Sequence, residues 1–430
     1  MNWKRFIVFL LLICLFSMVM GLLMLVRRPD TITFLITGDT QGYLVPCGCR
    51  VVPAGGLARR ASLIRILEKN KRNGRVVPVE ITHGFADRGP GREILNREMG
   101  DFFNRHRYLV GIGGYDLLLG KKRLNAYCGK GAECFLAGNP AFQGSKEYRV
   151  GGWGIGPIGP EGARLRLVFL AGSVSGGVAL PDPVEALKKE IKAHPADGYV
   201  VMGQFSPETI SGIVETRAPI IAVAGQWMST ITSIPQEAKD RVVVYIGDRG
   251  RRASVLKVSR LVDKWSVLPS IFYLGKNVPS DKKVEGEVSR VLKKVNEVNA
   301  SALANSSRES AGSDGYVGAK ECGRCHTRQY DFWKKTRHSS ATSDLSIDHQ
   351  ENNPACLECH STGLGKDGGY PQKSVDLSGV QCEACHGPGG KHPGKKKMVK
   401  PELDKTCATC HTHRDSPSFN AEGYWRLVKH

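Results

Sequence analysis

The stretch "GVQCEACHGPGGKH", residues 379–392, contains two cysteines, a histidine directly after the second cysteine, and a further histidine six residues on. The pattern Cys-x-x-Cys-His occurs four times, and every copy lies in the last quarter of the chain. With 13 Cys and 12 His among 430 residues, chance would produce only ~0.01 copies. The copies occupy residues 322–326, 356–360, 382–386 and 407–411.

This spacing is the attachment pattern of c-type haem. Two thiols three positions apart can form thioether bonds to the two vinyl groups of one porphyrin, and the adjacent histidine then ligates the iron. Zinc is the alternative for a Cys-x-x-Cys pair, but a zinc site gives no reason for a histidine after every second cysteine. We therefore expect four covalently attached c-type haems. The attachment residues are Cys322, Cys325, Cys356, Cys359, Cys382, Cys385, Cys407 and Cys410, and the proximal iron ligands are His326, His360, His386 and His411.

Each iron has a second axial position, which histidine or methionine usually fills. The preferred candidates are His338, His392 and His430, followed by His349. His413 is the last choice, because it follows His411 so closely that it must serve a different haem or none. An iron without a second ligand could bind a small molecule. Two histidines on one iron lower its potential relative to a histidine and a methionine.

Residues 6–26 are uncharged throughout. As a helix they would span about 31 Å, which is enough for a bilayer core. A cleaved signal peptide is the alternative, but its apolar region is usually shorter and a small-x-small cleavage site should follow. We favour an uncleaved anchor within residues 1–30. Because c-type haem is attached outside the bacterial cytoplasm, we expect a single-pass inner-membrane protein with the bulk of the chain in the periplasm or at the cell exterior.

The formal net charge of +20 is concentrated in the first part of the chain, because residues 316–430 carry 17 Lys and Arg against 13 Asp and Glu. Haem propionates would make this last part neutral or acidic. We expect no nucleic-acid binding, because the expected location is extracytoplasmic and no basic motif interleaved with aromatic residues is present. The expected partners are the inner membrane and redox proteins, a donor and an acceptor of unknown identity.

Residues 31–299 are predicted to form a layered α/β domain, because short buried-strand candidates alternate with amphipathic helices. Residues 300–315 are small and polar, as in an interdomain linker. Residues 316–430 then provide only 115 residues for four haems, so the haems must supply most of the buried apolar area. The strand candidates are 31–37, 76–82, 165–172, 198–205, 218–225 and 241–248, and the helix candidates are 56–70, 93–103, 183–193 and 285–299.

The last domain resembles the tetrahaem cytochrome c-554-type family. The matching text is "GYVGAKECGRCHTRQYDFWKKTRHSSA" (315–341), "CLECHSTG" (356–363), "VQCEACHGPGGKH" (380–392) and, more loosely, "GYWRLVKH" (423–430). The resemblance implies a mostly helical domain with little regular sheet, tightly stacked haem pairs and an electron-carrier role. It also places the family's distal histidines on His338 and His392, with His430 as a looser match.

The first domain resembles the 5′-nucleotidase branch of the metallophosphoesterases, on "TFLITGDTQGYLVPCGC" (33–49) and "GGLARRASLIRIL" (55–67). Active members hold two metals with Asp-x-His, Gly-Asp, Asn-His and His-x-His motifs, and these metals activate water. Here Asp39 is kept, but Gln41, Gly114-Tyr115, Gln226 and Met228 stand where imidazole or amide ligands should be, and only Asp87 remains as a second carboxylate. Two carboxylates cannot hold a dinuclear centre of this kind.

We therefore expect that the metallophosphoesterase-like fold is kept and that its hydrolase chemistry is lost. His83, His106 and His194 fall on no metal position of the family pattern, so we expect them to be structural or solvent-facing.

Four cysteines outside the haem motifs remain in the first domain: Cys47, Cys49, Cys128 and Cys134. The simplest interpretation is a disulfide, either 128–134 or one that joins these residues to 47 or 49. A zinc or iron–sulfur site is the alternative.

These features indicate a membrane-anchored multihaem cytochrome that carries single electrons and is not itself an enzyme, with the α/β domain as scaffold or docking surface. Three alternatives remain open. One is a haem enzyme of the nitrogen-oxide reductase type, with one five-coordinate haem. The second is a nucleotide phosphohydrolase with an attached redox domain. The third and weakest is a purely structural subunit of a larger respiratory complex.

Overall fold

The computed structural model describes residues 31–46, 53–128, 133–136, 148–150, 152–159, 161–171, 180–226, 236–238, 241–261, 263–306, 315–392, 397–412, 415–416 and 419–430. The predicted anchor, residues 6–26, lies outside these ranges. Within them, no helix is both long enough and apolar enough to cross a bilayer.

The first domain contains two β-sheets. In the seven-stranded sheet, β1 (Thr31–Thr37) pairs in parallel with β2 (Arg75–Glu80) and antiparallel with β12 (Arg252–Leu261), and the full order is β13-β12-β1-β2-β3-β4-β5. The six-stranded sheet has the order β10-β11-β9-β8-β7-β6. The other strands are β3 (Leu109–Ile112), β4 (Glu133–Leu136), β5 (Tyr148–Val150), β6 (Gly152–Ile158), β7 (Ala163–Leu170), β8 (Gly198–Gln204), β9 (Ile220–Gln226), β10 (Gln236–Ala238), β11 (Arg241–Ile246) and β13 (Lys264–Tyr273).

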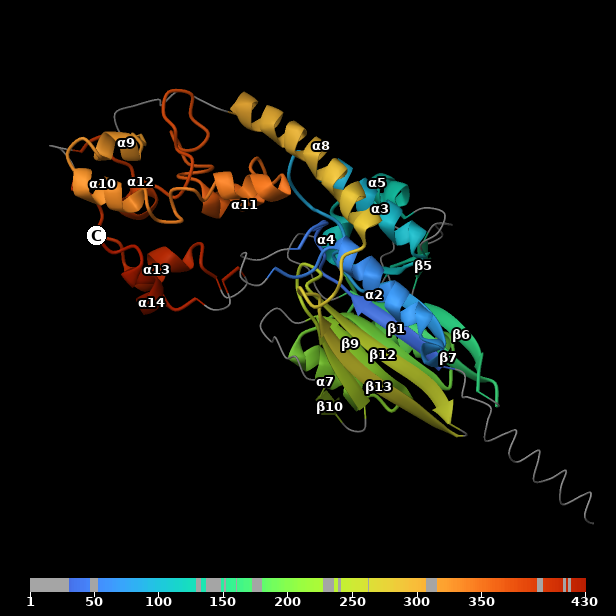
Figure 1. Ribbon diagram of the computed structural model, residues 1–430. Helices are drawn as coiled ribbons and strands as arrows, with labels where there is room; N and C mark the ends of the chain where they lie inside the picture. The colour runs from blue at the N-terminus through green and yellow to red at the C-terminus, as the bar shows by residue number, and fades with distance from the viewer. Residues whose placement is uncertain are drawn as a thin grey trace, which may run out of the picture.

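The two sheets lie face to face between two layers of helices (Figure 1). Helices α2 (Leu57–Lys69), α3 (Arg92–Arg105) and α8 (Lys282–Ser306) pack against the first sheet, and α6 (Pro183–Ala193) and α7 (Pro207–Glu215) pack against the second. Because β1 is covered on both faces, it reads as a continuous apolar run rather than an alternating one. The predicted layered α/β fold is confirmed.

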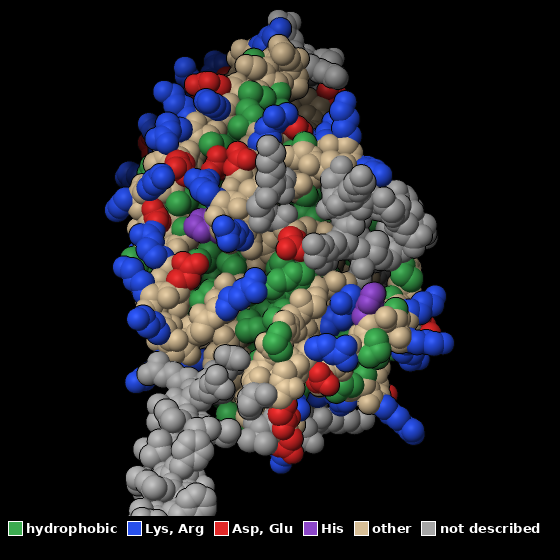
Figure 2. Space-filling model, turned by 90° about the vertical axis from the view of Figure 1, so that its right-hand side faces the viewer, with side chains coloured by type: hydrophobic (Ala, Val, Ile, Leu, Met, Phe, Trp, Pro, Cys, Tyr) green, Lys and Arg blue, Asp and Glu red, His purple; other side chains and the backbone are tan. Residues whose placement is uncertain are grey.

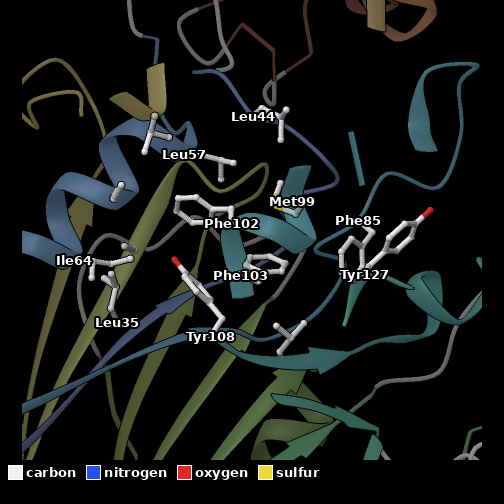
Figure 3. Packing of buried hydrophobic residues seen from close by; sticks show 14 of the residues in the cluster. Leu35, Leu44, Leu57, Ile64, Phe85, Met99, Phe102, Phe103, Tyr108 and Tyr127 are labelled. Carbon is white, nitrogen blue, oxygen red and sulfur yellow. The ribbon is translucent and has the colours of Figure 1, made fainter. Parts of the chain in front are cut away.

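An aromatic cluster fills the space between α3 and the first sheet (Figure 3). Phe103 lies against Tyr108 with ring centres 4.9 Å apart, and Phe85 lies against Tyr127 at 5.2 Å. These contacts fix the loop after β2, which carries His83 and Asp87, onto the helical layer. The aromatic cluster therefore positions one side of the site described below.

The element predictions are largely confirmed. Helix α6 has the predicted bounds, and α2 differs from the predicted helix by one residue at each end. Helix α8 runs from Lys282 to Ser306, so it extends into the predicted linker 300–315. The alanines at 300, 302 and 304 favour helix, which explains why a segment of linker-like composition continues α8.

The second domain has little regular structure. Its elements are α9 (Ala319–Cys322), α10 (Thr327–Trp333), η3 (Ser343–Asp348), α11 (Pro354–His360), α12 (Cys382–His386), α13 (Leu403–Ala408) and α14 (Ala421–Arg426), with one isolated β-bridge, Ser361–Ser378. The mostly helical domain implied by the family resemblance is therefore observed. Few of its described apolar side chains are buried: Tyr316, Ala319, Ala341, Leu357 and Leu377.

Two described contacts join the domains. The Asn296 side chain on α8 donates to the Glu351 carboxylate (2.7 Å), and its amide oxygen accepts from the Asn352 side chain (3.0 Å). Arg249, in the turn between β11 and β12, forms an ion pair with Asp415. These contacts hold the second domain at the end of the α/β domain where the parallel strands β1, β2, β9 and β11 finish (Figure 1).

Arg60 on α2 and Glu80 at the end of β2 form a buried ion pair at 3.0 Å, and both side chains are almost fully inaccessible. Removing one partner leaves the other charge buried and unpaired. We predict that Arg60→Met lowers the free energy of unfolding by about 3–5 kcal/mol in urea titrations followed by far-UV circular dichroism. The double variant Arg60→Met/Glu80→Met should lose less than the single variant. Equal losses in both would contradict this prediction.

Candidate haem centre and remnant metal site

Each Cys-x-x-Cys-His motif forms about one turn of helix. The His326 N–H donates to the Cys322 carbonyl, and the His411 N–H donates to the Cys407 carbonyl, both at 2.9 Å. Residues three and four apart on a helical turn share a face, so each turn presents both thiols and the imidazole to one side. The local chain conformation therefore fits one porphyrin per motif.

Three of the four proximal histidines face a second histidine. The ring centres of His326 and His392 are 6.3 Å apart, those of His338 and His411 are 6.3 Å apart, and those of His386 and His430 are 6.1 Å apart. Two metal–nitrogen bonds of about 2 Å, with about 1 Å from each nitrogen to its ring centre, would place two imidazoles on one metal about 6 Å apart. The three pairs therefore have the separation that a shared iron requires.

His360 differs from the other proximal histidines. Its Nδ1 lies 2.7 Å from the Ala341 carbonyl oxygen, and among the described residues no other histidine ring is in contact with it. His349, the fourth distal candidate, also has no ring contact with another described histidine, so the structure does not place it opposite His360. His413 lies outside the described residues.

Hydrogen bonds at Nδ1 orient these rings. His386 contacts the Val399 carbonyl and His430 the Val428 carbonyl, both at 2.9 Å, whereas His411 contacts the Ser416 hydroxyl at 3.0 Å. A partner at Nδ1 leaves Nε2 as the metal-binding atom and fixes the plane of the ring. A hydroxyl is a weaker acceptor than a carbonyl, so the fourth motif has a distinct environment.

Thiols of different motifs lie in contact. The Cys322 and Cys382 side chains lie within hydrogen-bond distance of each other, and so do those of Cys359 and Cys410. The first motif therefore lies beside the third, and the second lies beside the fourth. This arrangement gives the order in which neighbouring porphyrins would be paired.

The α/β domain reaches the fourth motif through Arg249. The Arg249 guanidinium lies over the Tyr43 ring at 5.0 Å and pairs with Asp415. Asp415 in turn accepts a hydrogen bond from the Thr412 hydroxyl (2.9 Å), directly after His411, and its neighbour Ser416 contacts His411. The segment Asp415–Ser416 therefore connects the Arg249 charge of the first domain to the proximal histidine His411.

The remnant metal site lies at the ends of β1 and β2. Asp39 Oδ1 accepts a hydrogen bond from the Gln41 side chain (2.8 Å) and lies 2.8 Å from His83 Nδ1. The His83 ring stacks on Tyr115 with centres 4.7 Å apart. Asp116 accepts the N–H groups of His83 (2.8 Å) and Gly113 (3.0 Å). His83 is therefore a buried member of this site, which the family pattern did not indicate.

The surroundings of the remnant site raise the pKa values of two of its side chains, Asp116 and His83. Burial raises the pKa of Asp116 to about 6. Burial works against protonation of His83, but its hydrogen bond to Asp39 and the nearby Asp116 and Asp39 charges raise the His83 pKa overall. An Asp39–His83 ion pair replaces the ligand arrangement expected of a metal site.

The remaining predicted ligands do not complete a metal centre. Asp87 is partly exposed and its nearest described charged partner is Arg88, at 3.9 Å. Among the described residues, no group of three His, Cys, Asp or Glu side chains is placed to hold a metal ion. The Gln226 side chain and Met228 lie outside the described part of the chain. His106 packs on Phe102 at 4.6 Å and His194 ends α6, as expected for residues outside the site.

Cys128 and Cys134 form a disulfide. This is one of the two pairings expected from the sequence, and it rules out a site that uses all four free thiols of this domain. Cys47 and Cys49 lie outside the described residues.

Both domains are similar to known proteins. Residues 321–387 match the family described as cytochrome c554 and c-prime. Cytochrome c-554 of Nitrosomonas europaea is 30% identical over 153 residues, an alignment that covers 26% of this chain and 65% of that protein. The C-terminal domain is similar to the cytochrome c-554 family. The chain therefore contains a multihaem cytochrome domain with covalently bound c-type haem.

The α/β domain has the fold of 5′-nucleotidases. A 5′-nucleotidase precursor from Thermus thermophilus matches with a TM-score of 0.50 and 18% identity, over 67% of this chain and 62% of that one. The sulfate thiohydrolase SoxB, also from Thermus thermophilus, matches with a TM-score of 0.51 and 12% identity, over 61% and 60%. The chain thus spans less than two thirds of each relative, and at these identities the likeness concerns the fold alone.

We predict that His392→Ala converts one low-spin ferric haem of the cytochrome domain to high spin, because His326 would lose the imidazole opposite it. Electron paramagnetic resonance of the oxidised protein measures the change. His349→Ala is the matched control and should leave the spectrum unchanged. A new high-spin signal in His349→Ala, with none in His392→Ala, would reverse the assignment.

We also predict that Arg249→Gln lowers the potential of one haem, because the Asp415 charge beside the fourth motif then lacks its partner and favours the oxidised iron. The shift should be roughly tenfold in the ratio of oxidised to reduced haem, or about 59 mV. Spectroelectrochemical titration measures it. Arg249→Gln/Asp415→Asn removes both charges and should recover most of the shift. An unchanged titration in Arg249→Gln would show that this contact does not influence the haem.

Proposed function

We propose that this protein is a membrane-anchored, extracytoplasmic electron carrier that holds four c-type haems and passes single electrons between a donor and an acceptor protein. The observation that carries the proposal is the set of three facing histidine pairs beside three of the four attachment motifs. Haem iron held in this way supplies one-electron redox chemistry. At these three motifs the protein would supply both axial ligands, and Nδ1 contacts orient the rings of His386, His430 and His411.

Close packing of the motifs supports transfer between haems. The contacts Cys322–Cys382 and Cys359–Cys410 bring motifs together in two pairs. The few buried apolar side chains of this domain also fit a core supplied by porphyrins. We assign attachment to the eight motif cysteines, proximal ligation to His326, His360, His386 and His411, and distal ligation to His392, His338 and His430.

The haem count tests this proposal. We predict four haems per chain by mass of the matured protein and by the optical spectrum after reduction. Cys382→Ala/Cys385→Ala should remove one haem, and Cys128→Ala/Cys134→Ala should remove none, because that pair lies in the α/β domain. Fewer than four haems in the unsubstituted protein would overturn the carrier as described.

A second candidate function rests on His360. Because no described histidine faces its ring, the haem of the second motif can have an open coordination position, as a haem enzyme of the nitrogen-oxide reductase type requires. An open position would bind an external ligand without displacing a protein group.

Carbon monoxide tests this second candidate. We predict that the reduced protein binds about one carbon monoxide per chain, measured by optical titration. His360→Ala should alter this binding, whereas Cys128→Ala/Cys134→Ala should not. If the fully reduced protein binds no carbon monoxide, every haem has two protein ligands. The haem-enzyme candidate is then excluded, and only the proposed carrier function is left.

A further inference from the structure

The end of the α/β domain opposite the cytochrome domain has an unusual composition. The parallel strands β1, β2 and β8 begin at this end, and so does the described chain, at Thr31 (Figure 1). The β12–β13 hairpin also turns here, because Thr31 pairs with Ser259 and the hairpin closes at Leu261 and Lys264. We call this end the basal surface and define it by Arg75, Trp153, Arg260, Leu261, Lys264 and Trp265.

Two Arg–Trp pairs form the centre of the basal surface. The Arg75 guanidinium lies over the Trp153 ring at 5.3 Å, and that of Arg260 lies over the Trp265 ring at 5.1 Å. The first pair joins the two sheets, because Arg75 begins β2 and Trp153 belongs to β6. Trp265 is held by a hydrogen bond from its Nε1 to the Asp197 carbonyl (2.9 Å). The aromatic rings are therefore fixed and partly exposed.

The charge of this end is positive. Lys71 and Arg72 add to the basic side chains of the basal surface, and both are exposed. The acidic side chains nearby include Glu161, Asp197, Asp263 and Glu190. Asp197 accepts a hydrogen bond from the Arg164 N–H (2.7 Å), and Glu190 forms an ion pair with Arg166. Leu261 is 52% exposed among these charges. Figure 2, from one side, shows basic side chains set among apolar ones in the lower part of the molecule.

Tryptophan beside arginine, with an exposed leucine and a lysine, is the composition of a protein surface at a membrane interface. Tryptophan rings are enriched at the level of the lipid headgroups. Each Lys or Arg near an anionic membrane contributes about fivefold to binding. We propose that the basal surface lies on the anionic phospholipid headgroups of the membrane.

The length of the chain before Thr31 supports this inference, which rests on the proposed anchor in residues 6–26. Four residues, 27–30, separate residue 26 from Thr31, so the chain makes five steps between them, and an extended chain spans at most about 3.5 Å per step. Thr31 can therefore lie no more than about 18 Å from the end of the apolar segment. If residues 6–26 span the bilayer, the short connection keeps this end of the domain close to the membrane surface.

The proposal fixes where the cytochrome domain stands. It lies beyond the carboxyl ends of the parallel strands, and β12 alone, with ten residues, spans about 33 Å. The α/β domain then separates the haems from the membrane surface by its own length along the strands. Their partners are proteins, or domains of proteins, that extend into the aqueous phase.

The test uses the full haem-loaded chain in vesicles of phosphatidylcholine alone or with one quarter phosphatidylglycerol. Hydrogen exchange of the β12–β13 hairpin measures contact at the basal surface. We expect slower exchange in the anionic vesicles than in the neutral ones. Arg75→Gln/Arg260→Gln/Lys264→Gln should abolish the difference, because three charges contribute about a hundredfold together. Lys283→Gln/Lys293→Gln/Lys294→Gln removes equal charge from exposed positions on α8 and should preserve it.

Alkaline extraction of the same vesicles reports the anchor separately. Equal exchange in both lipids, with the protein resistant to extraction, would overturn the basal contact and leave the anchor intact. Extraction of the protein together with lipid-dependent protection would overturn the anchor and keep the contact. A difference that persists in the basal triple variant would also overturn the proposal, since another surface would then carry the binding.

Discussion

The cytochrome domain depends on histidines that face each other across a gap of about 6 Å. His326 and His392 are far apart in the chain, as are His338 and His411. A metal that bridges such a pair closes a long loop, and closing long loops removes entropy from the unfolded chain. Few buried apolar side chains of this domain are available to hold these segments together instead. Haem iron bound at these pairs would therefore stabilise the fold of this domain.

The remnant site of the α/β domain satisfies its own charges. Asp39 is held by Gln41 and His83, and Asp116 by backbone N–H groups, so the carboxylates that would attract a metal already have partners. The same end of the domain gained a different role. Arg249, beside Tyr43 in this region, contacts the cytochrome domain.

The sequence predicted the features that neighbouring residues determine. It did not predict contacts between segments that are far apart in the chain. The attachment cysteines and proximal histidines follow from a five-residue spacing, and β1 and α6 from their own apolar patterns. The pairing of motifs could not be predicted, because it depends on how segments far apart in sequence meet. His83 was missed for the same reason: only the parallel pairing of β1 with β2 brings it to Asp39. The β12–β13 hairpin was not predicted, because β13 is half-exposed along its length and lacks a continuous apolar run.

The two interdomain contacts also order the haem positions relative to the α/β domain. Arg249 holds the segment after the fourth motif, and Asn296 holds the segment just before the second. The second and fourth motifs are themselves in contact through Cys359 and Cys410, so this pair is the one fixed to the α/β domain. The first and third motifs form the other pair, through Cys322 and Cys382. In the proposed carrier, the α/β domain would therefore influence the environment of one haem pair. The environment of the second pair would be set mainly by the cytochrome domain itself.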